Sequence, residues 1–214
     1  PGLPPTTADI LDAFSRQAGY CSKRGADLTA TIIDGAALDI EKGGPLAALV
    51  SEFREDPARG ALALRIAGAV HYLAINRRAG ELQQTFAAPS LLNSVDARAK
   101  IAALVEREPE VFERFLAGPP QTNEINRIAA LLPAFSEVQK ATGLPLDLVE
   151  LGASGGLLLM PDRCSIDYGS FRWGDGPITL TSNWRGAAPD LVERLHVRRR
   201  LGCDRSPFDY SDPE

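Results

Sequence analysis

Residues that bind metals or form disulfides are scarce in this sequence. Its 214 residues include three cysteines and two histidines. Cys21, Cys164 and Cys203 lie far apart without C-x-x-C spacing, and an odd number does not suit a disulfide framework. We therefore expect reduced thiols in a cytoplasmic protein, and no metal site. His71 falls in an apolar helical segment and His196 among arginines, a placement that supports no Ser-His-Asp arrangement.

An excess of positive charge and long apolar runs are also lacking. The formal net charge is −5, so no global basic field exists to hold a phosphate backbone, and nucleic acid is not the expected partner. No window approaches the roughly 18 uninterrupted apolar residues of a membrane span, and residues 1–10 lack the regions of a signal peptide. We therefore expect no membrane span and no export. The dense basic run Arg198–Arg200 is interpreted as a solvated face.

A helical apolar period fills the first two thirds of the chain. The composition, 44% hydrophobic and 24% charged, is ordinary for a globular protein. Up to about residue 142, apolar residues recur at three- and four-residue spacing. The most apolar segment, residues 60–80, is the expected central buried helix, and Pro133 predicts a kink. We expect residues 1–142 to form a helical domain, with residues 6–142 almost wholly helical.

Strand-like patterns begin after Gly143. The segment "LPLDLVEL" has the continuous apolar character of a strand in a buried parallel sheet. The next segments predict, in order, a hairpin of "CSIDYGSFRWGD" and "PITLTSNW" joined at Gly-Asp-Gly, a short amphipathic helix in "APDLVERL" and a final strand in "VRRRLGCD". The predicted fold class is therefore helix-rich α/β. The helical domain is followed, over residues 143–214, by the first part of a Rossmann-like α/β domain with a β-hairpin insertion, and residues 146–204 hold every strand.

The stretch "ELGASGG" combines an acid at a strand end with a glycine-rich turn. The dinucleotide fingerprint G-x-G-x-x-G, begun at Gly152, requires glycine where the chain has Ser154 and Leu157. The alternative, acid-x-Gly-x-Gly-x-Gly, is the first motif of Rossmann-like S-adenosylmethionine methyltransferases. The chain resembles that motif at Glu150, Gly152 and Gly156, with Ser154 in place of the middle glycine.

This resemblance implies an S-adenosylmethionine site made of Glu150, Gly152, Ser154, Gly155 and Gly156. Glu150 would accept from the ammonium group or from water around the methionyl group, and the glycines would let the main chain pass beneath the ribose. The other interpretation is a tight strand-to-helix turn, in which Glu150 caps a helix and Gly155 and Gly156 relieve strain. Both interpretations stay open from the sequence.

Two further polar groups belong to the same hypothesis. Asp204, at the end of the last predicted strand, matches the acid that commonly holds ribose hydroxyls in such domains. Its alternative is a turn-initiating aspartate near Pro207. The polar side chains of the segment 121–127 either cap the next helix or face the substrate as a wall of the same pocket. The predicted substrate-binding residues are Gln121, Asn123, Glu124 and Arg127.

Six separated segments, in order, resemble a bacterial family described as domain of unknown function 2332. They are "AFSRQAGYC", "RIAGAVHYLAINRRAGEL", "PPQTNEINRIAALL", "GLPLDLVELGASGGLLLMPDR", "WGD" and "GCDRSPFDYSDPE". The resemblance brings no established reaction, and it implies a longer family member with more α/β structure. The leading hypothesis is a methyltransferase-like enzyme with S-adenosylmethionine as cofactor and an unknown acceptor. The alternatives are a non-catalytic ligand-sensing or interaction module and another nucleotide-using enzyme. The catalytic residues and the oligomeric state stay open.

Overall fold

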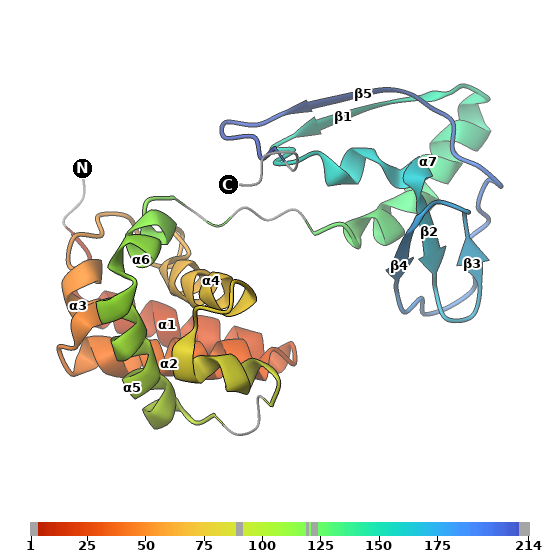
Figure 1. Ribbon diagram of the computed structural model, residues 1–214. Coiled ribbons are helices and arrows are strands. Elements are labelled where there is room, and N and C mark those ends of the chain that lie inside the picture. Colours follow the sequence, from red (N-terminus) through yellow and green to blue (C-terminus); the bar gives the residue numbers. More distant parts are fainter. Residues whose placement is uncertain (1–3, 89–91, 119, 121–123, 210–214) are drawn as a thin grey trace. The chain divides into compact units, whose positions relative to one another are not determined.

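The computed structural model describes residues 4–88, 92–118, 120 and 124–209 (Figure 1). Its contacts divide the chain into two compact units, residues 1–120 and 121–214. The change from helices to strands comes later, after residue 142, so one helix belongs by its contacts to the unit that holds the strands. None of the helices in the described ranges is both long enough and apolar enough to cross a membrane.

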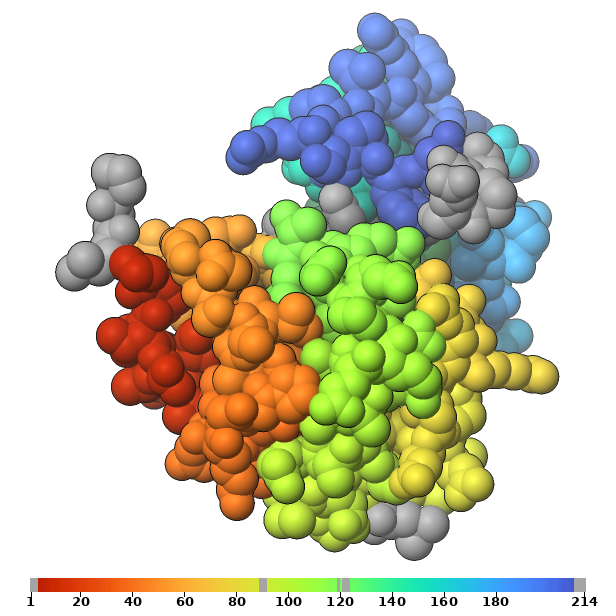
Figure 2. Space-filling model, turned by 60° about the vertical axis from the view of Figure 1, so that its left-hand side comes forward, coloured from red at the N-terminus to blue at the C-terminus, as the bar shows by residue number. Residues whose placement is uncertain are grey.

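The first unit is built of helices around one apolar core. Its elements are α1 (Thr7–Lys23), α2 (Asp27–Glu41), α3 (Pro45–Val50), α4 (Leu62–Ile75), the 3-10 helix η1 (Gly80–Phe86), α5 (Ser94–Arg107) and α6 (Pro109–Leu116). As predicted, α4 is deeply buried, with Leu62, Val70 and Leu73 inaccessible to solvent. The space-filling view shows the green side chains of the α5–α6 region beside the orange ones of α2 and α3 (Figure 2).

Local signals start these helices, and small residues let them pack. The side-chain hydroxyl of Thr6 accepts from the backbone N–H of Asp9, whose carboxylate accepts from the Thr6 N–H, forming a capping box. Gly35 of α2 lies against α5, because a Cβ at this position would come within 2.5 Å of the Ala97 Cβ. The absence of that Cβ permits the close helix contact.

An arginine is buried inside the first unit, which the sequence did not indicate. Arg65 of α4 is 1% exposed. Its guanidinium donates to the Gly60 carbonyl at 2.7 Å, to the Leu116 carbonyl at 2.6 Å and to a Glu55 carboxylate oxygen at 2.9 Å. Arg65 also lies over the Phe53 ring, 5.1 Å from its centroid. It therefore joins α4 to the end of α6 and to the loop before α4.

In its described residues, the second unit combines one α-helix and two 3-10 helices with two small sheets. Its elements are α7 (Arg127–Thr142), β1 (Leu146–Leu151), the 3-10 helices η3 (Leu157–Leu159) and η4 (Pro161–Arg163), β2 (Cys164–Asp167), β3 (Arg172–Trp173), β4 (Ile178–Thr181) and β5 (Val197–Cys203). β1 and β5 form a parallel pair, and the other strands form a sheet of order β3-β2-β4 (Figure 1). Every strand in the described ranges lies within residues 146–204, as expected. Pro133 lies inside α7 without ending it.

The parallel pair departs in two ways from the expected domain. Only one of its faces is covered, because Leu146 and Leu148 are buried whereas Val149 is 66% and Leu151 81% exposed; the sequence pattern predicted a strand covered on both faces. The turn after β1 leads into the three-residue 3-10 helix η3 and not into an α-helix. The structure therefore establishes a helix-rich α/β protein with a small parallel sheet.

The hairpin is formed by different strands from those predicted. β2 pairs antiparallel with β3 and parallel with β4, so the segment from β3 to β4 must cross the start of β2. Gly174 and Gly176 lie in this crossing. A Cβ on Gly176 would be 2.2 Å from the Arg163 carbonyl oxygen. The Gly-Asp-Gly sequence thus permits a close backbone crossing and does not join the two strands of a hairpin.

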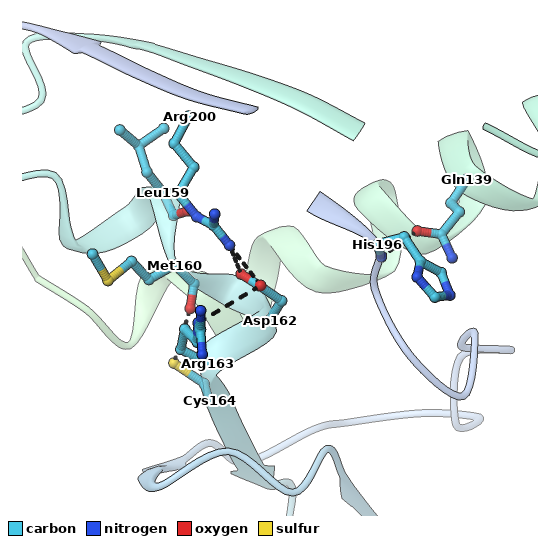
Figure 3. Close-up of polar contacts among 8 residues, drawn as sticks. All are labelled: Gln139, Leu159, Met160, Asp162, Arg163, Cys164, His196 and Arg200. Atoms are coloured by element: carbon cyan, nitrogen blue, oxygen red, sulfur yellow. Dashed lines mark hydrogen bonds and ion pairs between the residues drawn. The ribbon is translucent and has the colours of Figure 1, made fainter. Parts of the chain in front are cut away.

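The amphipathic helix predicted for residues 188–195 is absent, and these residues form a loop. Their backbone carbonyl groups accept hydrogen bonds from side chains elsewhere in the unit. Trp173 Nε1 donates to the Val192 carbonyl, and Gln139 Nε2 donates to the Arg194 carbonyl. The Gln139 Oε1 accepts from the His196 N–H at 2.8 Å (Figure 3). Tertiary hydrogen bonds replace those that a helix would have made itself.

Candidate functional site

The carboxyl ends of β1 and β5 bring together two acids that are far apart in the sequence. Glu150 is in register with Gly202, and Leu151 with Cys203, so the turn after β1 lies beside Asp204. In open α/β sheets, ligands bind outside the carboxyl ends of parallel strands. This edge is therefore the candidate site, and it includes most of the residues that the sequence predicted for a cofactor.

Left-handed backbone conformations define the turn. Gly152 has a φ of 73°, Ser154 of 49° and Gly156 of 71°. Glycine adopts this region without the steric cost that a Cβ imposes. A Cβ built on Gly152 would meet no atom of the described chain within 4 Å, so the space beside it is open. The backbone requires these glycines whether or not a ligand approaches.

The end of β5 holds the turn in place. The N–H groups of Gly152 and Ala153 donate to the Cys203 carbonyl at 2.8 and 3.1 Å. The Ser154 N–H donates to Asp204 Oδ2 at 2.8 Å, and the Ser206 N–H donates to Asp204 Oδ1 at 2.9 Å. These backbone bonds, first from Ser206 and then from Ser154, hold the pKa of the Asp204 carboxyl below its usual value. Asp204 Oδ2 therefore supports the turn, and Oδ1 supports the loop that follows Asp204.

The hydrogen bonding of Glu150 differs from that of Asp204. It is partly buried, and its Oε2 is inaccessible to solvent and accepts no hydrogen bond within the described part of the chain. Burial raises the pKa of Glu150, and the positive charge of Arg127 opposes that rise. A buried carboxylate oxygen without a donor is costly. A ligand that brings a donor to it would remove that cost.

Among the described residues of the polar segment before α7, Arg127 lies near this site. Arg127, the first residue of α7, lies near enough to Glu150 to act on its pKa. The Glu124 carboxylate accepts locally from the Asn126 N–H at 2.9 Å, and Asn126, the N-cap of α7, forms no side-chain capping bond. Gln121 and Asn123 lie outside the described residues.

An ion pair that the sequence did not reveal fixes the segment after the turn (Figure 3). Arg200 Nη2 donates to both oxygens of Asp162 at 2.5 Å, and Arg200 Nε donates to the Leu159 carbonyl at 2.8 Å. This partly buried pair holds η3 and η4 against β5. The solvated-face interpretation fits Arg198, which forms an exposed pair with Asp147, but it is wrong for Arg200. A period of two along β5 does not separate these arginines, because residues 198 and 200 share a face of a regular strand. The register irregularity at Arg198, opposite Leu146 and Asp147, interrupts that alternation.

One of the three cysteines, the exposed Cys203, lies at this edge, as the last residue of β5. All three are unpaired, and burial raises the pKa of the Cys164 thiol, which donates to the Met160 carbonyl (Figure 3). No cluster of three or more metal-ligating side chains occurs in the described ranges. Among the described residues, this edge presents the Glu150 carboxylate with the Arg127 guanidinium near it.

A hollow of the described chain lies elsewhere, in the first unit. It has a volume of about 430 Å³ and lies between α1 and residues 54–58. Several of its charged side chains already have partners, with Asp12 paired to Arg16 and Glu55 to Arg65. Because these charges are compensated within the chain, this hollow is a weaker candidate than the edge of the parallel pair.

Comparison with known proteins identifies a family without a reaction. The model of a family described as "Uncharacterized protein conserved in bacteria (DUF2332)" matches residues 11–214. No curated protein and no solved structure matches the chain. The geometry of the site therefore has to carry any statement about function.

Proposed function

Because the chain belongs to the uncharacterised bacterial family DUF2332, we propose from the site alone that it binds an adenosyl-type small molecule at the carboxyl ends of β1 and β5. S-adenosylmethionine is the first candidate, since the resemblance of "ELGASGG" to the methyltransferase motif falls on this edge. Glu150 and the turn from Gly152 to Gly156 would contact the ligand, and Arg127 would lie beside it. The enzymatic form of the proposal is methyl transfer to an unknown acceptor.

One observation carries the proposal: the buried Oε2 of Glu150 accepts no hydrogen bond within the described residues, at a sheet edge where the space beside Gly152 is open. Buried polar atoms in native proteins are nearly always satisfied. A ligand donor at Glu150 would satisfy this one. Methyl transfer depends mainly on alignment and desolvation, so the enzymatic form does not require a general base beside the turn.

The test is isothermal titration calorimetry of the protein with S-adenosylmethionine and S-adenosylhomocysteine. We expect Glu150→Gln to weaken binding about 10- to 100-fold, the equivalent of about 1.5–3 kcal/mol for a hydrogen bond to a charged group. Glu193→Gln is the matched control, because Glu193 is exposed and precedes the opposite end of β5. Its affinity should equal that of the wild type.

The same titrations over a pH series show whether the affinity for the ligand rises or falls with pH. A ligand donor prefers the ionised carboxylate, and burial raises the pKa of Glu150 above its ordinary 4.5. Below that raised pKa, binding must release a proton, so affinity should rise with pH through it and then level off. Glu150→Gln should lose this dependence. No binding of either compound at millimolar concentration, a free energy weaker than about 4 kcal/mol, would end the proposal.

A non-catalytic ligand-sensing module is the second candidate. It is favoured by the absence, at this edge and within the described residues, of a nucleophile hydrogen-bonded to a base. Binding without conversion of S-adenosylmethionine to S-adenosylhomocysteine in the presence of cell extract would support the module over the enzyme.

A further inference from the structure

The three-stranded sheet of the second unit has a polar face that the proposed function does not use. Along β2, the partly exposed Ser165 and Asp167 alternate with two buried residues, so both side chains lie on the same outward face. Ser165 is in register with Thr179 of β4, and Asp167 is in register with Arg172 of β3. This face therefore brings together two hydroxyl groups and two opposite charges.

A hollow of about 220 Å³ lies on this face. The four side chains of the two cross-strand pairs line it, and so does the crossing formed by Gly174 and Gly176, which passes close to the backbone at the start of β2. Asp175, between these glycines, also lines the hollow. Pockets for drug-sized ligands have volumes of about 300–1,000 Å³, so this hollow suits a smaller molecule.

The two hydroxyl groups satisfy each other only in part. Ser165 Oγ and Thr179 Oγ1 are 3.1 Å apart and share one hydrogen bond. The pair has two hydroxyl hydrogens, and one bond uses only one of them. The other hydrogen can therefore be donated to a ligand, and the oxygens keep lone pairs that can accept from one.

The charged side chains of the hollow also keep unused capacity. Arg172 donates through Nε and Nη2 to Asp167 Oδ2 at 3.0 and 2.7 Å, and its other N–H groups have no acceptor within the described part of the chain. Asp175 forms no hydrogen bond or ion pair with any described residue. The hollow thus offers unused donors together with a carboxylate that no described contact engages.

Charge and spacing limit the kind of ligand that uses all of these groups. Asp167 and Arg172 neutralise each other, which leaves the Asp175 charge to repel an anion. Ser165 and Asp167 are two residues apart along β2, a separation of about 7 Å, which is too wide for one ammonium group to contact both cross-strand pairs. A ring that carries several hydroxyl groups spans this separation, and each hydroxyl can both donate and accept.

We propose that this hollow is a second binding site, which takes a neutral polyhydroxylated ring of about monosaccharide size. Asp175 accepts hydrogen bonds from ring hydroxyls, whereas Arg172 and the hydroxyl pair of Ser165 and Thr179 donate to ring oxygens. The proposal goes beyond the adenosyl site at the carboxyl ends of β1 and β5 and does not depend on it.

Ligand-observed NMR titration of the unmodified protein with D-glucose, D-galactose, D-mannose and myo-inositol tests the proposal. None of the lining residues is aromatic, so no ring is available to stack on a sugar, and we expect at least one probe to bind with a dissociation constant of about 1–10 mM. Asp175→Ala should weaken that probe about 10-fold, and Thr179→Val, which keeps the side-chain shape, about 3-fold. Tryptophan fluorescence in urea checks that both variants remain folded.

Two further variants locate the bound probe. Glu193→Ala removes an exposed carboxylate of the same unit outside the hollow, and Glu150→Gln alters the adenosyl site; neither should change the affinity for the polyol. No binding of any of the four probes at 50 mM would overturn the proposal, as would equal affinity in the wild type and Asp175→Ala. Tighter binding of L-serine or ethanolamine than of every polyol would refute the ligand class. None of these results bears on the adenosyl site.

Discussion

The backbone conformation at positions 152 and 156 requires glycine, whether or not a ligand binds. Both residues have φ near +70°, in the region where a side chain is strained. The cofactor motif and the simple turn therefore require the same residue type at these positions. A glycine substitution cannot distinguish the two interpretations, whereas Glu150 can, because the turn does not depend on its carboxylate.

Two substitutions with opposite expected effects on stability test whether backbone conformation determines the sequence of the turn. Gly152→Ala places a Cβ in a left-handed conformation and should destabilise the second unit by about 1–2 kcal/mol, although the space around it is open. Ser154→Gly removes a Cβ from a left-handed conformation, and we expect it to leave stability unchanged or to raise it by up to about 1 kcal/mol.

The measurement uses the two tryptophans of the chain, which are Trp173 and Trp184 and which both lie in the second unit. Their fluorescence during urea unfolding reports that unit alone. Equal destabilisation by both substitutions would mean that side-chain contacts, and not backbone conformation, determine the sequence of the turn.

At the scale of elements, the strand order β3-β2-β4 depends on a close backbone crossing at two positions that have no side chain. Gly174 and Gly176 pass over the start of β2, where a Cβ on Gly174 would be 2.6 Å from the Cys164 carbonyl oxygen. Backbone atoms cannot move aside as a flexible side chain can. The strand order is therefore coupled to the residue type in this short segment.

Gly176→Ala should therefore be among the most damaging single substitutions in the second unit. We expect a loss of about 2–3 kcal/mol, typical of an overpacked interior. Asp175→Ala, at the exposed position between the two glycines, is the control and should change stability by less than about 0.5 kcal/mol. Tryptophan fluorescence in urea measures both. A tolerated alanine at 176 would refute the close crossing.

At the scale of the whole molecule, the two units have separate apolar cores. The core of the first unit includes Phe14, Ile33 and Phe112, and that of the second includes Ile128 and Ile166. Each core consists of residues from its own side of the division at residue 120. We therefore expect a local defect in one unit to leave the stability of the other nearly unchanged.

Arg65→Met tests this independence. It removes the donors to Gly60, Leu116 and Glu55 from a site that is 1% exposed, and it should destabilise the first unit by about 3 kcal/mol. Far-UV circular dichroism should show the helical transition at lower urea, while the tryptophan transition stays in place. Arg59→Met, at an exposed position of the same loop, is the control. A joint shift of both signals would show that the units unfold together.

The sequence by itself determined features that depend on near neighbours. The spacing of apolar residues located the helices before residue 142 and the strands β1 and β5, and the acid and glycines of "ELGASGG" located the turn. The six separated segments, which occur in the order typical of the family, also predicted the family membership, and the family model confirms it. These features depend on neighbouring residues or on the order of segments along the chain. They can therefore be predicted without knowing which segments are in contact.

Only the tertiary structure decided which segments meet. It paired β2 with β3 and β4 and replaced a predicted helix at 188–195 with a loop. It buried Arg65, and partly buried Arg200, against specific partners. It also gave both oxygens of Asp204 to backbone N–H groups and left one of Glu150 without a described donor. The physical reason is that pairing and burial depend on residues tens of positions apart, whose competition for the same donors and acceptors has no local signature in the sequence.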